Sequence, residues 1–96
     1  MGVTREEREK LSQTILDAVF FLTEGGNTRY NKMLELIIGE YDSIQEEVSS
    51  IAGSFTDNAR KLRNLQDCNY RLRSLSERVC KLVAAERFLR TYADVH

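Results

Sequence analysis

The sequence of 96 residues contains no proline and no tryptophan, and only five glycines, two cysteines and one histidine. The absence of proline removes the residue that most often interrupts a helix. With 42% apolar and 30% charged residues, the composition also excludes the disordered and collagen-like classes. We therefore expect one folded domain over residues 1–96, with helix as its main structure.

No segment is apolar over the length of a membrane span, which needs about 20 residues. The longest strongly apolar stretch runs from Ile15 to Leu22 and contains Asp17. No signal-peptide pattern precedes it. We therefore expect a cytoplasmic protein that is not inserted in a membrane.

The cysteines and the histidine do not form a metal-binding pattern. Cys68 and Cys80 are twelve residues apart in a segment that reads as helix, which separates their α-carbons by about 18 Å and prevents a disulfide between them. The histidine is His96, and no CxxC motif is present. We predict free thiols in a reducing compartment, no metal site and no cofactor.

The sequence also lacks the motifs of common catalytic sites. It has no nucleophile elbow, no HExxH motif and no strand before Gly25-Gly26 that would make these glycines a phosphate-binding loop. The serines have no histidine nearby to activate them. The sequence therefore predicts a protein that is not an enzyme.

The first predicted helix covers residues 4–23. Thr4 and Glu7 have the spacing of a capping box, and Gly25-Gly26 follows as a terminator. Its apolar residues recur at helical spacing. They are Leu11, Ile15, Ala18, Val19 and Leu22.

The second predicted helix covers residues 28–52, with Gly53 as its C-terminal stop. Its apolar residues follow alternating steps of four and three, which is the heptad pattern of helices that pack along one another. This seam consists of Tyr30, Leu34, Ile37, Tyr41, Ile44, Val48 and Ile51. Met33, Leu36 and Ile38 widen it, so we expect two neighbouring helices to cover this part.

The third predicted helix covers residues 56–93, starting at Ser54 or Thr56 as cap. Its seam contains Leu65, Cys68, Leu72, Leu75, Val79, Leu82 and Leu89, and Glu86 interrupts it. A break near Asn69, where helix propensity is weak, would create a fourth helix. The absence of proline and glycine favours a continuous helix. The predicted fold class is thus an all-α antiparallel bundle of three helices with coiled-coil-like packing.

The third helix is longer than the other two, and this difference predicts a partner. If it folds back directly along the second helix, Val79 lies opposite Tyr30 and everything beyond Val79 projects past the Gly25-Gly26 loop. That projection is apolar, and a monomer would rarely leave it in water. The residues predicted to bind a partner are Phe20, Phe21, Val83, Phe88, Leu89 and Tyr92.

The charges are divided between the two halves of the chain. Residues 1–55 carry five basic and ten acidic side chains, and residues 56–96 carry nine and five. The helices either attract one another through these charges or leave a basic face for a partner. We predict a non-enzymatic protein–protein interaction module (an adaptor, assembly subunit, chaperone or anti-activator) acting as a homodimer or within a coiled-coil hetero-complex. The alternative is a small dimeric DNA-binding transcriptional regulator that contacts nucleic acid through the basic third helix.

Overall fold

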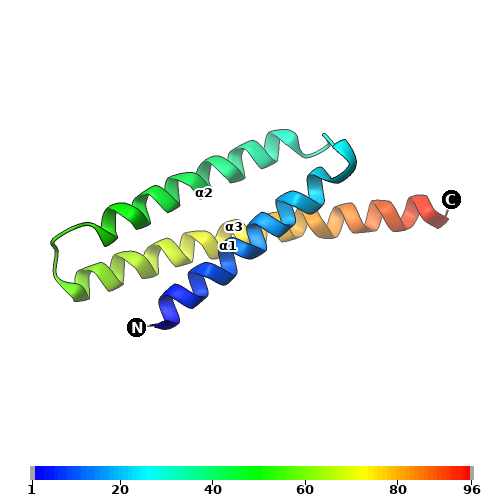
Figure 1. Ribbon diagram of the computed structural model, residues 1–96. Coiled ribbons are helices and arrows are strands. Elements are labelled where there is room, and N and C mark those ends of the chain that lie inside the picture. Colours follow the sequence, from blue (N-terminus) through cyan, green and yellow to red (C-terminus); the bar gives the residue numbers. More distant parts are fainter. Residues whose placement is uncertain (1, 96) are drawn as a thin grey trace.

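The computed structural model describes residues 2–95, and these residues form three α-helices and no strand. Helix α1 spans Gly2–Thr23, α2 spans Asn31–Ala52 and α3 spans Asn58–Val95, with a short 3-10 turn, η1, at Glu24–Gly26. Figure 1 shows α2 running antiparallel to α1 and α3. The predicted all-α bundle of three helices is confirmed.

The helices begin at positions that differ from the prediction by a few residues. Helix α1 begins at Gly2, so Thr4 lies inside the helix and does not cap it. Before α2, the side chain of Asn27 accepts a hydrogen bond from the Arg29 N–H at 3.0 Å. This local turn delays the start of α2 to Asn31.

The cap of α3 is Asp57, not Ser54 or Thr56. One carboxylate oxygen of Asp57 accepts a hydrogen bond from the Ala59 N–H at 3.1 Å, and its carbonyl accepts one from the Lys61 N–H at 3.0 Å. A carboxylate at this position satisfies a free donor of the first turn and interacts well with the helix dipole. The connection between α2 and α3 therefore takes up five residues, 53–57.

Helix α3 is continuous over all 38 residues. Asn69, where a break was considered, is helical and buried. The continuous helix gives the molecule its length, with principal extents of 59 × 22 × 16 Å.

The core lies where α1 and α2 pack against α3. The predicted seams supply most of it: Leu34, Ile37 and Ile44 are buried on α2, and Leu72, Leu75 and Val79 on α3. The remaining buried apolar side chains are Ile15, Ala18, Leu22, Tyr30 and Cys68. The seam prediction fails at Leu89, which is 40% exposed, because α2 has no residues at that level of α3.

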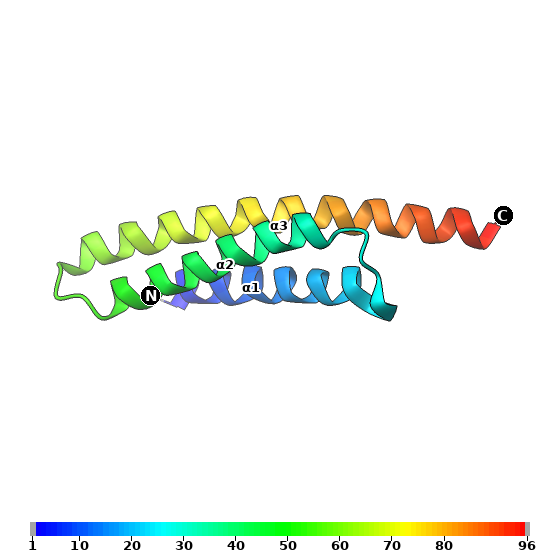
Figure 2. The ribbon, with the colours of Figure 1, turned by 90° about the horizontal axis from the view of Figure 1, so that it is seen from above.

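The register between α2 and α3 differs from the predicted one. The Tyr30 hydroxyl donates a hydrogen bond to Glu86, seven residues and about 10 Å further along α3 than Val79. The longer 53–57 connection lets α3 start beyond the end of α2. The connector between α1 and α2 therefore reaches Glu86 and Arg90, and the uncovered part of α3 begins after Arg90. Figure 2 shows this end projecting past the other helices.

The expectation that two helices cover the wide part of α2 is wrong. Met33, Leu36 and Ile38 are exposed, and Leu36 retains 71% of its accessible surface. The reason lies in the arrangement of the bundle, in which α1 and α2 both pack chiefly on α3. No further helix within residues 2–95 covers the flanks of α2.

Candidate functional site

The six residues predicted to bind a partner lie in separate parts of the surface. Phe21 and Val83 line a hollow between α1 and α3 with a volume of about 280 Å³. Two guanidinium groups lie over the Phe21 ring, that of Arg90 at 4.4 Å and that of Arg87 at 5.6 Å from the ring centre. This cation–π geometry attaches the end of α1 to α3, so Phe21 is half-buried within the chain.

The other predicted residues are more exposed. Phe88 and Tyr92, one turn apart on α3, stack with their ring centres 6.5 Å apart, and they keep 68% and 57% of their surface accessible. Leu89 points about 100° away from Phe88, because successive helical residues differ by that angle. Phe20 lies on α1 and is 76% exposed.

Glu86 occupies a buried position in the seam of α3, with 5% of its surface accessible. One of its oxygens accepts from Arg29 at 3.3 Å and the other from Arg90 at 3.1 Å, and Tyr30 donates a third hydrogen bond. Burial raises the pKa of this carboxyl, but the hydrogen bonds from Arg90 and Tyr30 and the charges of both arginines outweigh burial and lower the pKa overall.

Arg90 extends this cluster to α1. Its guanidinium also donates to the Phe21 carbonyl at 3.4 Å and lies 3.8 Å from the carboxylate of Glu24. The heptad pattern identifies Glu86 only as an interruption of the seam. Its position in an apolar seam with an arginine four residues later could have indicated a buried ion cluster.

Three arginines of α3 pair with glutamates of the other two helices. Arg71 pairs with Glu47 of α2, and Arg73 pairs with Glu7 of α1. A further pair joins Arg78 and Glu40 at 3.2 Å. These pairs favour attraction between the helices, which is one of the two predicted interpretations of the charge division.

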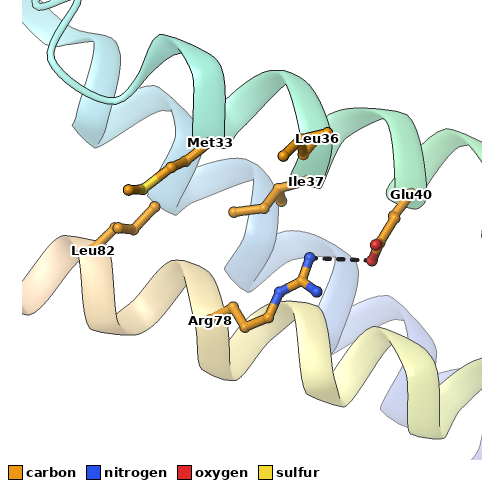
Figure 3. A pocket seen from close by; sticks show the side chains of 6 residues that line it. All are labelled: Met33, Leu36, Ile37, Glu40, Arg78 and Leu82. Atoms are coloured by element: carbon orange, nitrogen blue, oxygen red, sulfur yellow. Dashed lines mark hydrogen bonds and ion pairs between the residues drawn. The ribbon is translucent and has the colours of Figure 1, made fainter.

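An apolar groove runs between α2 and α3. Met33, Leu36 and Ile37 of α2 face Leu82 of α3, and the Glu40–Arg78 pair closes one end (Figure 3). The groove has a volume of about 370 Å³. The sequence pattern places Met33 and Leu36 in a stripe that two helices are expected to cover, so the pattern does not predict this exposed surface.

Within residues 2–95, no group of three or more histidine, cysteine, aspartate or glutamate side chains is arranged to hold a metal ion. Burial raises the pKa of the Cys68 thiol, and the nearby Glu47 carboxylate raises it further. Cys80 is free and exposed at the Phe21 hollow.

No family model matches this chain, and neither the curated proteins nor the solved structures include a significantly similar one. The surfaces described above are therefore interpreted from their own chemistry. Among the described residues, no helix has the length and apolar character needed to cross a bilayer.

Proposed function

We propose that this protein is a non-enzymatic protein–protein interaction module that acts through helix packing and associates with itself. The observation that supports this proposal is the number of large apolar side chains left exposed on so small a domain. Phe20, Leu36, Phe88 and Tyr92 each keep more than half of their surface accessible. Phe88 and Tyr92 are stacked side by side, and an exposed apolar patch of this kind is typical of an interaction site.

The energetic requirement for association is moderate. Burying a large apolar side chain contributes about 1.5–3 kcal/mol, whereas a micromolar complex needs about 8 kcal/mol of net binding free energy. Several of the exposed side chains must therefore be buried together, because association also costs translational, rotational and side-chain entropy. An adaptor, an assembly subunit, a chaperone or an anti-activator would all use such a surface. The free thiols are compatible with a function in the reducing cytoplasm.

The alternative of nucleic-acid binding has weaker support. Arg71, Arg73, Arg78 and Arg90 on α3 are paired with glutamates of the same chain. Binding phosphates with these side chains would require breaking these pairs, and the pairs of Arg71, Arg73 and Arg78 join α3 to the other helices. The exposed apolar residues have no evident role in that function.

The experiment that tests the proposal measures the molar mass of the purified chain over a range of concentrations by light scattering. We expect a dimer for the unmodified chain and a monomer for the variant Phe88→Asp/Leu89→Asp. The matched control is Phe55→Asp, since Phe55 is fully exposed in the connection between α2 and α3. It should remain dimeric.

Circular dichroism accompanies each mass measurement, because the comparison requires that all variants keep their helical content. A chain that stays monomeric up to about millimolar concentration, where even weak complexes form, would contradict self-association. A heavier complex only in the presence of a different protein would replace the homodimer with a hetero-complex.

A further inference from the structure

The side of α3 turned away from the core carries a second series of residues with heptad spacing, which we call the outer face. Its members follow steps of four, three, four, three and four. They are Tyr70, Ser74, Glu77, Lys81, Ala84 and Phe88.

The outer face is exposed along its whole length. All six side chains are exposed, and Tyr70 at one end and Phe88 at the other keep 71% and 68% of their surface accessible. Eighteen residues separate these two aromatic residues, which is five helical turns, so they point in the same direction about 27 Å apart. Figure 2 shows that the side of α3 turned away from α1 is not covered by another helix.

The two charged residues at the middle of the outer face have no ionic partner. Within residues 2–95, neither Glu77 nor Lys81 forms an ion pair, whereas Arg71, Arg73 and Arg78 beside them all pair with α1 or α2. The outer face therefore presents one unpaired negative and one unpaired positive charge, four residues apart.

We propose that the outer face binds the outer face of a second copy of this chain, with the two α3 helices antiparallel and a two-fold axis between Glu77 and Lys81. This inference rests on the proposed self-association and specifies its surface and orientation. The axis places Glu77 of each copy opposite Lys81 of the other, which forms two ion pairs. Such charge complementarity selects the partner and the register.

The same register also pairs the remaining residues of the two outer faces with suitable partners. Ser74 faces Ala84 of the second copy, and these small side chains let the helices approach closely. Tyr70 faces Phe88 of the second copy at each end, and such aromatic pairs add to the energy of burial. Tyr92, stacked on Phe88, widens these two aromatic contacts.

Other arrangements of the same two faces are less favourable. A parallel pair would set Glu77 against Glu77 and Lys81 against Lys81, and like charges in facing positions oppose association. An antiparallel shift by one heptad toward the C-terminus would place Phe88 against Glu77 of the second copy. Only the proposed register pairs charges with charges and aromatic residues with aromatic residues.

The first test exchanges the central charges and measures the dimer dissociation constant by sedimentation equilibrium. Glu77→Lys alone and Lys81→Glu alone should each weaken the dimer by about tenfold or more, because each creates two like-charge contacts. The double variant Glu77→Lys/Lys81→Glu should return close to the original value. In a parallel dimer the unmodified chain, the single variants and the double variant would all place like charges together, so neither single variant would weaken the dimer in this way.

The second test uses a short bis-maleimide cross-linker in a Cys80→Ser background, which leaves the buried Cys68 as the native thiol. The double variant Ser74→Cys/Ala84→Cys should give covalent dimers. Each single variant should stay uncrosslinked, since equivalent cysteines would be ten residues, or about 15 Å, apart along the axis. Cross-linking of the single variants would instead indicate a parallel pair.

The outcomes separate this inference from the proposed function. If the chain dimerises but neither the charge exchange nor the double cysteine variant behaves as expected, the outer face is wrong and self-association uses another surface. Leu89 lies on the side of α3 that is turned toward α2, outside the outer face. If self-association uses that side, Leu89→Asp should weaken the dimer more than Phe88→Asp. A chain that is monomeric at every concentration contradicts both proposals.

Discussion

Glu86 carries a charge at a position where the heptad pattern calls for an apolar side chain. It is accommodated because Arg29, Arg90 and Tyr30 satisfy its oxygens. A buried carboxylate with fewer partners would oppose folding, since burial alone disfavours the charged form. Glu86 therefore fixes where the connector between α1 and α2 contacts α3.

We expect Glu86→Gln to lower the melting temperature at pH 7, and we expect the difference from the unmodified chain to shrink on acidification. The pKa of Glu86 is lowered in the folded chain from its ordinary value of 4.5. Its stabilising effect is therefore complete above the unfolded-state pKa and is lost as the pH falls through the lower folded-state value. Thermal unfolding followed by circular dichroism between pH 7 and acidic pH measures this.

The control for Glu86 is Glu9→Gln, which removes the exposed Arg5–Glu9 pair. Exposed pairs of this kind contribute little, so this variant should melt like the unmodified chain throughout. A Glu86→Gln difference that stays constant with pH would show that the charge of Glu86 is not what matters.

At the scale of the helix, Gly39 lies in the middle of α2 without a structural reason. A Cβ added there meets no atom within 4 Å, so the close helix crossing that would justify a glycine is absent from the described chain. We expect Gly39→Ala to raise the free energy of unfolding by about 1 kcal/mol, measured by urea denaturation, because alanine favours the helix.

The comparison for Gly39 is Gly25→Ala in the turn after α1. Gly25 has a φ of 68°, a left-handed conformation that costs other residues about 1–2 kcal/mol. This variant should be less stable than the unmodified chain although its Cβ also meets no atom. Equal effects of the two substitutions would contradict the explanation from backbone geometry.

The start of α3 depends on Asp57. Asp57→Ala removes the acceptor for the Ala59 N–H and should lower the free energy of unfolding by about 1 kcal/mol. Asp67→Ala serves as the control, because Asp67 is exposed in the interior of α3 and caps nothing. If both variants unfold at the same urea concentration, Asp57 does not act as a cap.

The existence and the apolar seams of the helices could be predicted from the sequence, but their first residues could not. Three residues before α3 have side chains able to cap a helix, namely Ser54, Thr56 and Asp57. The path of the 53–57 connection determines that Asp57 accepts the hydrogen bond from the first turn of α3. Likewise, Thr4 had the spacing of a capping box, yet α1 continues to Gly2. Short-range patterns of this kind leave several starting points of similar energy.

For the whole molecule, the sequence predicted three antiparallel helices, and it left open whether the acidic and basic halves attract one another or leave a basic face for a partner. It could not fix the register of α2 on α3, because register depends on contacts between residues far apart in the chain, such as Arg29 with Glu86 and Glu40 with Arg78. Contacts over long sequence distances also decide the surroundings of Phe21, which shares a hollow with Val83 and lies under the guanidinium groups of Arg87 and Arg90.

Helix α3 contributes to the core with one side and presents the outer face with the other, over 38 uninterrupted residues. Inserting or deleting a single residue after Cys80 would rotate everything beyond it by about 100°. Phe88 would then no longer align with Tyr70, and Glu86 would turn away from Arg29. Changes in the length of this helix are therefore tolerable only in steps close to whole helical turns, such as seven, eleven or eighteen residues, which keep both of its sides aligned at once.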